Sequence, residues 1–181
     1  MTFNVEQMKS TITRKGGLAY ANQWRVILPT ITTSAMTATD LDVTCRSVSL
    51  PGRQILTQER IIGMKPKKNA YAYGAEDVSM TFIVMADQGI KRYFDDWMAS
   101  IINFGTQGLT YKDFYVSDIT INQLKKPQVE KVDYSPNDVA YSCRLIRAFP
   151  TTVNALELNN EQGNLLELNV QFSYDDWQPL V

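Results

Sequence analysis

The segment that most constrains the fold is residues 166–174, in which apolar and polar side chains alternate without interruption. A repeat of two residues places every second side chain on the same face of an extended strand. The apolar face consists of Leu166, Leu168, Val170, Phe172 and Tyr174. The opposite face is almost entirely polar, so this strand covers a core on one side and meets solvent on the other, which is typical of antiparallel sheets.

Other segments with the same period, or with many β-branched residues, occur along the chain. We expect strands over residues 22–28, 42–50, 54–62, 77–85, 114–119 and 139–145, and a loop rich in Thr and Ser over residues 30–39. Helical patterns do not alternate with these strands, so an antiparallel sheet is favoured over a doubly wound α/β fold. The expected fold is mainly β, an antiparallel β-sandwich or barrel.

One segment has a helical period and a large aromatic face. Its apolar stripe consists of Ile90, Phe94, Trp97, Met98, Ile101 and Ile102, and charged side chains lie opposite. We expect one main helix, ending near Gly105, that flanks the sheet. Phe94, Trp97 and Ile101 are the expected anchors of this helix in the core.

The N-terminal segment predicts a short second helix. Val5, Met8 and Ile12 recur at helical spacing before the pair Gly16-Gly17, a common helix stop. The chain has 181 residues, 44% of them hydrophobic, which is enough for one sizeable core. We therefore divide it into an N-terminal helix or arm over residues 1–21 and one β domain over residues 22–181.

Composition narrows the possible chemistry. The chain has no histidine, which excludes Ser-His-Asp, Cys-His and HExxH sites. Its formal net charge of -1 disfavours a dedicated DNA-binding protein. No glycine pattern matches a phosphate-binding loop. Cys45 and Cys143 are too few for a zinc site with four cysteine or histidine ligands and are expected to be buried, reduced thiols. We expect no cofactor and no metal.

Two pairs of carboxylates are the remaining catalytic candidates. Asp95-Asp96 falls on the polar stripe of the expected helix, and Asp175-Asp176 follows the last strand. A carboxylate-dependent hydrolase would use these acids with a metal ion, and it stays a minor alternative. Exposed surface is the favoured interpretation of both pairs. Trp177, which follows the second pair near the end of the chain, is a candidate for an interface.

A long hairpin over about residues 53–76 carries the strongest local charge feature. Lys65, Lys67 and Lys68 lie in a turn-prone tip over residues 63–69, and Tyr71 and Tyr73 follow. The tip has no apolar face of its own, and a monomer core has no need of it. Three interpretations stay open: an exposed loop, an arm that contacts another protein, and a surface that binds nucleic acid through phosphate contacts and stacking.

Five segments in a fixed order resemble the tail tube proteins of phages with contractile tails. They are residues 47–53 (Ser-Val-Ser-Leu-Pro-Gly-Arg), 77–82 (Asp-Val-Ser-Met-Thr-Phe), 94–97 (Phe-Asp-Asp-Trp), 147–153 (Arg-Ala-Phe-Pro-Thr-Thr-Val) and 172–177 (Phe-Ser-Tyr-Asp-Asp-Trp). Together they span most of the chain from Trp24 to Trp177. The segment before Asn22 carries less of the resemblance.

The resemblance implies a structural, non-enzymatic subunit that forms hexameric rings, which stack into a tube through which phage DNA passes as cargo. It implies a sheath, a baseplate hub and a tail terminator as partners, and a place in the virion tail. Asp95 and Asp96 become candidates for contacts of the outer wall with the sheath. The long hairpin matches the arm of the family that joins subunits and rings, and its candidate contact residues are Arg53, Ile55, Glu59, Ile61, Met64, Lys65, Lys67, Lys68, Tyr71 and Tyr73.

Two alternatives to a phage tail tube stay open. Tubes of other contractile injection systems, including type VI secretion, and baseplate-junction proteins share the fold of this family. A nucleic-acid-binding β-barrel is the alternative from a different class. The N-terminus lacks the basic flank and apolar run of a signal peptide, and no segment is apolar enough to span a membrane, so we expect assembly in the host cytoplasm without a membrane.

Overall fold

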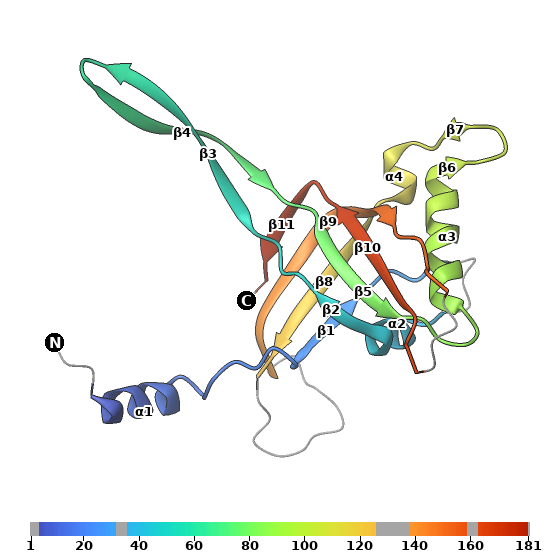
Figure 1. Cartoon of the computed structure of the whole chain (residues 1–181), viewed down its shortest axis with the longest axis horizontal. Helices are drawn as coiled ribbons and strands as arrows, with labels where there is room; N and C mark the ends of the chain where they lie inside the picture. Colours follow the sequence, from blue (N-terminus) through green and yellow to red (C-terminus); the bar gives the residue numbers. More distant parts are fainter. Residues whose placement is uncertain (1–3, 32–35, 126–137, 159–162, 181) are drawn as a thin grey trace.

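A computed structural model describes residues 4–31, 36–125, 138–158 and 163–180 of the chain (Figure 1). The helices and strands, in chain order, are α1 (Val5–Arg14), β1 (Trp24–Ile27), α2 (Ala38–Thr44), β2 (Cys45–Val48), β3 (Arg53–Ile62), β4 (Lys65–Ala75), β5 (Val78–Ile83), α3 (Gly89–Ile101), β6 (Ile102–Asn103), β7 (Gly108–Leu109), α4 (Lys112–Tyr115), β8 (Ser117–Leu124), β9 (Val139–Val153), β10 (Glu167–Ser173) and β11 (Asp176–Pro179). The chain is mainly β, with antiparallel strands, as the sequence predicts.

Seven of these strands form one sheet in the order β1-β8-β9-β10-β5-β2, with β11 also paired to β9. The first part of β9 pairs with β8 and β11, and its last residues pair with β10. Because one long strand serves both halves, the sheet folds into two layers around the core. β1 and β2, the outermost described strands of this order, are not paired with each other, so the body is an open sandwich and not a closed barrel.

The core lies between these layers and under α3. Alternate residues of β5 and β10 are buried, as their period of two predicts. Five aromatic rings pack in one continuous cluster, in which the centroids of contacting rings lie between 5.0 and 6.0 Å apart. They are Phe82, Tyr93, Phe94, Trp97 and Phe172. The aromatic stripe of α3 therefore covers β5 and β10.

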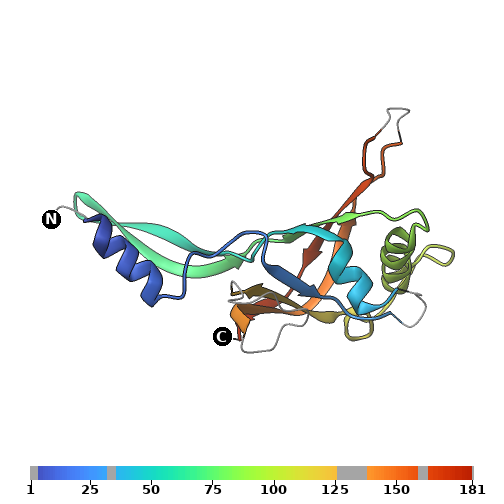
Figure 2. The same cartoon turned by 90° about the horizontal axis from the view of Figure 1, so that it is seen from below.

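The two projecting elements leave the body at the same end. Figures 1 and 2 show α1 and the β3–β4 hairpin extending away from the sandwich, with α3 at the opposite end. No side chain of α1 is buried. Its end confirms the expected glycine stop: the N–H groups of Gly16 and Gly17 donate to the carbonyls of Thr13 and Ile12, and both glycines have a positive φ.

A helix forms where the sequence predicts a loop and the start of a strand. The expected strand over residues 42–50 is wrong in its first part, because α2 continues to Thr44 and β2 begins only at Cys45. Thr37 and Asp40 form a reciprocal capping box that starts α2. Leu41 and Thr44, three residues apart, are buried. The expected loop over residues 30–39 also extends too far, and its residues 32–35 lie outside the described residues.

The expected tip of the long hairpin is too large. Only Gly63 and Met64 form the turn, and the lysines of the expected tip lie in β4. Residues 58–62 pair with residues 65–69 through the backbone. Backbone pairing of this kind needs no apolar face. Residues 65–69 of β4 have no hydrophobic pattern, so the sequence did not predict them as a strand.

Two further boundaries differ from the prediction. Phe114 and Tyr115 belong to α4 and not to a strand, and the carbonyl of Tyr115 accepts a hydrogen bond from the Trp97 indole at 2.8 Å. The main helix ends at Ile101 instead of near Gly105, since Ile102 pairs with Leu109 in the β6–β7 hairpin.

Candidate assembly interface

The β3–β4 hairpin offers the largest protruding surface of the described chain. None of its described side chains is buried, and its longest apolar side chains face solvent. Ile61 is 77% exposed and Met64 is 103% exposed. The structure places on this hairpin all the residues that the resemblance predicts for the arm: Arg53, Ile55, Glu59, Ile61, Met64, Lys65, Lys67, Lys68, Tyr71 and Tyr73. Exposed apolar side chains in such number are typical of a surface that contacts another protein.

The base of the hairpin is clamped to the end of the chain. The Arg53 guanidinium donates to the Trp177 carbonyl at 2.8 Å and lies over the Trp177 ring, 4.4 Å from its centroid. It also lies 3.9 Å from a carboxylate oxygen of Asp176. The first and last segments of the resemblance thus meet in space, and their contact holds the hairpin at a defined angle to the body. Trp177 stabilises this contact and is only partly buried.

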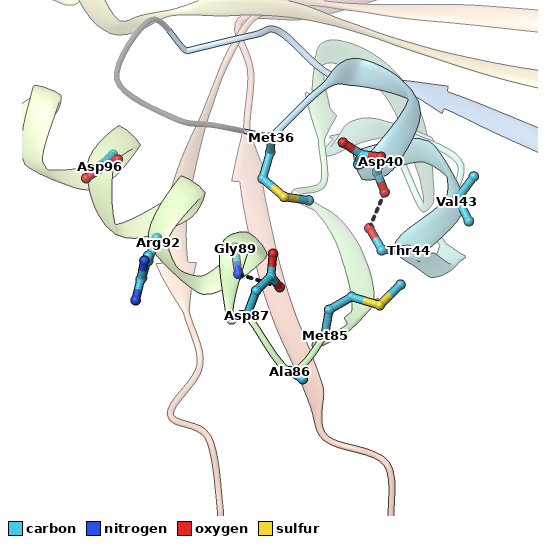
Figure 3. A pocket seen from close by; sticks show the side chains of 10 residues that line it. All are labelled: Met36, Asp40, Val43, Thr44, Met85, Ala86, Asp87, Gly89, Arg92 and Asp96. Atoms are coloured by element: carbon cyan, nitrogen blue, oxygen red, sulfur yellow. Dashed lines mark hydrogen bonds between the residues drawn. The ribbon is translucent and has the colours of Figure 1, made fainter.

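A cavity of about 800 Å³ opens between α2 and the start of α3 (Figure 3). Its lining residues are Met36, Asp40, Val43, Thr44, Met85, Ala86, Asp87, Gly89, Arg92 and Asp96. Apolar side chains therefore mix with three carboxylates and one guanidinium. The Met36 side chain extends into the space between the two helices (Figure 3).

Local hydrogen bonds hold the walls of this cavity. Asp40 accepts from the backbone and side chain of Thr37, and both contacts hold the pKa of this carboxyl below its ordinary value. Asp87 accepts from the Gly89 N–H at 3.1 Å. A Cβ on Gly89 would lie 2.7 Å from the Met36 sulfur, so a larger residue at this position would displace the end of the Met36 side chain. Asp40 and Asp87 thus line the cavity together with the apolar side chain of Met36.

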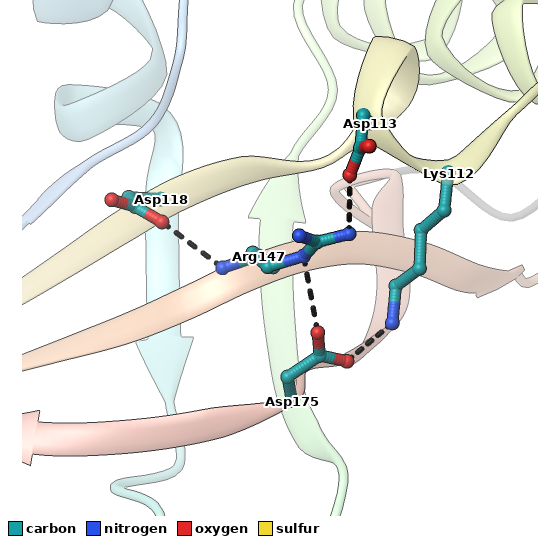
Figure 4. A network of polar contacts seen from close by, with 5 residues as sticks. All are labelled: Lys112, Asp113, Asp118, Arg147 and Asp175. Atoms are coloured by element: carbon teal, nitrogen blue, oxygen red, sulfur yellow. Dashed lines mark hydrogen bonds and ion pairs between the residues drawn. The ribbon is translucent and has the colours of Figure 1, made fainter.

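A polar network fixes the bend of β9 (Figure 4). Arg147 pairs with Asp113 at 2.5 Å and with Asp175 at 3.1 Å, and Asp175 also pairs with Lys112. The network joins α4, β9 and the turn between β10 and β11. Asp175 and Arg147 belong to two segments of the resemblance that lie far apart in the sequence, and the fold brings them into contact.

The Asp118 carboxylate accepts a hydrogen bond from the backbone at this bend. Arg147 has a φ of 56°, and the β8–β9 pairing shifts register beside it. Its N–H donates to Asp118 at 3.0 Å, and the Arg144 side chain pairs with the same carboxylate. The Arg147 N–H is the main cause, and Arg144 the next, of an Asp118 pKa below the ordinary value. The ionised carboxylate therefore stabilises the point at which the sheet turns.

The main helix places its predicted residues on two faces. Phe94, Trp97 and Ile101 are buried, with exposed fractions of 0%, 2% and 8%. Asp95 is exposed and pairs with Lys91 one turn earlier. Asp96 is half-buried and borders the cavity. The two acids therefore lie on different surfaces of α3, Asp95 toward solvent and Asp96 at the cavity.

The four acids of the hydrolase alternative do not converge in the described part of the chain. Asp95 pairs with Lys91, Asp175 pairs with Lys112 and Arg147, and Asp176 lies beside Arg53. No group of three or more Cys, Asp or Glu side chains suited to a metal ion occurs among the described residues.

Cys45 and Cys143 are buried and unbridged, which confirms the prediction of two buried thiols. Burial raises the pKa of Cys45 to about 12 and the pKa of Cys143 to about 11. No helix in the described ranges has both the length and the apolar character that a membrane span requires.

The fold resembles solved structures of contractile injection systems. A chain of the PVC sheath–tube complex, an extracellular contractile injection system in its extended state, matches with a TM-score of 0.65 and 13% identity, over 98% of this chain and 98% of that chain. A chain of the PVC sheath/tube terminator matches with a TM-score of 0.63 and 15% identity, over 90% and 96%. A chain of the anti-feeding prophage baseplate, 6-fold symmetrised, matches with a TM-score of 0.62 and 13% identity, over 90% and 95%. At these identities the likeness shows a shared fold.

The model of the phage tail tube protein family matches residues 10–179, almost the whole chain. The chain therefore belongs to the phage tail tube protein family. No curated protein sequence gives a significant match.

The sequence predicts the long hairpin but gives no indication of the cavity. Four of the ten lining residues, Met36, Asp40, Val43 and Thr44, lie in α2 or just before it, in a region that we expected to be loop and strand. The signal that would have revealed α2 is the spacing of Thr37 and Asp40, a threonine followed three residues later by an acid, which forms a capping box. The contact between Arg53 and Trp177 has no signal in the sequence.

Proposed function

We propose that this protein is the non-enzymatic structural subunit of a contractile-tail tube, in which hexameric rings stack head to tail. The observation that carries the proposal is the exposed β3–β4 hairpin on a body whose sequence matches the tail tube family. An arm with no core partner in its own described chain becomes buried when subunits join. The six-fold symmetry of the anti-feeding prophage baseplate supports rings of six.

The partners follow from the same comparisons. The structures that share this fold include a sheath–tube complex, a sheath/tube terminator and a baseplate. We infer that this chain joins a sheath along the tube wall, with Asp95 on the exposed face of α3 as a contact. A baseplate hub and a terminator would close the two ends. Asp96 lines the cavity between α2 and α3 and is not placed in this contact.

Phage DNA is the proposed cargo, which crosses the lumen during ejection and is not bound. The formal net charge of -1 suits passage, because each phosphate neutralised by the wall would add salt-dependent affinity. The virion tail is the proposed location, after assembly in the host cytoplasm. A tube or baseplate-junction protein of another contractile injection system is the alternative, and a neighbouring capsid, sheath or toxin gene would separate the two.

Negative-stain electron microscopy of the purified protein at high and low concentration tests the proposal. We expect hollow rings or tubes. A matched variant replaces residues 60–67 with Asn-Gly, which joins Glu59 to its cross-strand partner Lys68 by a short turn. It should remain a folded monomer with an unchanged circular dichroism spectrum, and it should form no tubes. Normal tubes from this variant would contradict the role of the arm.

The nucleic-acid-binding alternative rests on the lysines and tyrosines of the same hairpin. Tyr71 and Tyr73 are 65% and 64% exposed, so bases have access to them. Lys68 pairs with Glu59 at 3.3 Å, which lowers the positive charge available for phosphates. Micromolar binding of single-stranded DNA that weakens steeply with salt, without rings in the micrographs, would favour this alternative.

Residues 1–21 are proposed as an appendage of the β domain. The described side chains of α1 make no buried contact, so removal of these residues exposes no core. A chain that starts at residue 22 should keep the melting temperature of the full chain. A large decrease would mean that the segment belongs to the folded domain.

A further inference from the structure

We infer that the cavity between α2 and α3 receives the tip of the β3–β4 hairpin from a second copy of the chain. The tip is defined as residues 59–68, and the cavity as the ten residues named above. This inference rests on the proposed function and adds to it the surface that accepts the arm. It also gives a role to a cavity that the monomer fold leaves open.

The tip and the cavity lie at opposite ends of the molecule. In Figures 1 and 2 the hairpin extends to one side of the body, and the N-terminal end of α3, with α2 beside it, lies toward the other side. A contact between different surfaces of identical subunits repeats without limit when the two surfaces point in opposite directions. The placement of the tip and the cavity meets this requirement.

The charges of the two surfaces are complementary. The tip carries four basic side chains and one acid, and Lys68 is paired with that acid, Glu59. Arg60, Lys65 and Lys67 therefore give the tip its positive charge. The cavity carries three carboxylates against one guanidinium. Opposite net charges steer two surfaces together and fix their orientation.

The apolar side chains are complementary as well. Met64 at the turn is fully exposed, and Ile61 beside it is largely exposed. In the cavity, Met85 is 49% exposed and Val43 is 72% exposed. Methionine adapts to irregular surfaces, so a methionine at the turn against a methionine in the wall suits a contact between separate subunits. A volume of about 800 Å³ is large enough for several side chains.

The chemistry of the cavity disfavours a nucleic acid as occupant. Three carboxylates repel phosphates, and Arg92 alone does not offset them. A basic segment of a different protein would fit by charge. This chain already carries such a segment, with a methionine at its end and a rigid base, so a second copy is the occupant that the structure favours.

A charge exchange tests the inference. Lys65→Glu with Lys67→Glu reverses the tip, and Asp87→Lys with Asp96→Lys reverses the cavity without touching the capping box of α2. Each double variant should fold but should lose tubes that sediment in the ultracentrifuge. The tip variant should keep the melting temperature of the wild type, and the cavity variant should melt slightly lower, because it loses the contact of Asp87 with the Gly89 N–H. The quadruple variant, with an acidic tip and a basic cavity, should recover them. A 1:1 mixture of the two double variants should also assemble, because each tip then meets an opposite cavity.

The matched control is Glu6→Lys with Glu157→Lys, the same charge change at exposed positions outside the cavity, and it should assemble normally. Folded double variants that assemble like the wild type would overturn the inference while leaving the tube proposal intact. Failure of the quadruple variant to recover tubes would overturn it as well. Absence of tubes in the wild type would instead count against the proposed function.

A photo-crosslinker at position 64 gives a second readout that does not depend on complete tubes. At high protein concentration it should attach to peptides of a second chain that contain Val43 or Met85. Attachment elsewhere, or no attachment between chains, would overturn the inference. A crosslink to the cavity without tubes would support the contact and count against the tube.

Discussion

Removal of the Trp97 side chain from α3 should strongly destabilise the fold. Its ring is 2% exposed and packs against Tyr93 and Phe172, with centroids 5.9 and 6.0 Å away. Its indole N–H donates to the Tyr115 carbonyl at 2.8 Å and so ties α4 to α3. Truncation of a buried Trp to Ala costs about 3 to 5 kcal/mol, and the unpaired carbonyl adds about 1 kcal/mol.

Thermal unfolding followed by circular dichroism measures this loss. For a domain of this size each kcal/mol lowers the melting temperature by about 2 to 4 °C, so Trp97→Ala should lower it by roughly 10 to 20 °C. Trp97→Phe keeps the ring contacts but loses the indole hydrogen bond, and should cost about 1 to 2 kcal/mol. It also serves as the measurable variant if Trp97→Ala does not fold.

Tyr111→Ala is the matched control, because Tyr111 is an aromatic residue of the next loop that is 83% exposed. Its melting temperature should stay within about 2 °C of the wild type, since exposed substitutions change stability by about 0.5 kcal/mol or less. A Trp97→Ala variant that melts as high as Tyr111→Ala would refute the placement of the aromatic stripe of α3 against the sheet.

Three further predictions concern the base of the arm, the bend of β9 and the thiols. Arg53→Ala should cost only about 1 kcal/mol of stability, because the side chain is half exposed, but it should lower the yield of tubes in micrographs since the clamp on Trp177 is lost. Asp118→Asn should lower the unfolding free energy by about 1 kcal/mol at pH 7. Because the pKa of Asp118 is lowered in the folded state, the ionised carboxylate contributes its full stability above the ordinary carboxyl pKa of about 4. This contribution disappears as the pH falls through the lowered value. Chemical denaturation should therefore show a difference in unfolding free energy between the wild type and Asp118→Asn at pH 7 that becomes smaller in acid. A thiol reagent at pH 8 should leave Cys45 and Cys143 unmodified in the folded protein and modify both in urea, and rapid modification of the folded protein would contradict their burial.

The bend of β9 shows how one fold supports both a body and an arm. The strand serves both layers of the sandwich, and Arg147 and Asp118 hold the point where it passes between them. The β10–β11 turn is tied to the same point through Asp175, and β11 then carries Trp177 to the base of the hairpin. The direction of the arm therefore depends on the bend through a short series of contacts.

The sequence by itself determined the elements that bury one complete face. β10 and β5 alternate because one side of each strand is in the core, and α3 repeats its apolar stripe because that stripe covers the sheet. It also predicted the long hairpin, because glycine, proline and lysine interrupt any apolar pattern there. The resemblance to tail tube proteins rests on the order of five short segments along the chain, and this order can be read without knowing which segments are in contact.

Only the tertiary structure decided which segments meet. α2 and α4 are short, and a pattern over so few residues does not distinguish a helix from a strand. In the structure, the capping box of Thr37 starts α2, and the Trp97 indole donates to the carbonyl of the last residue of α4. The contact of Arg53 with Trp177 and the cavity between α2 and α3 join residues far apart in the chain. Local periodicity reports burial within a single element, but it carries no information about the neighbours of that element. The hairpin was therefore predictable from the sequence, and the cavity was not.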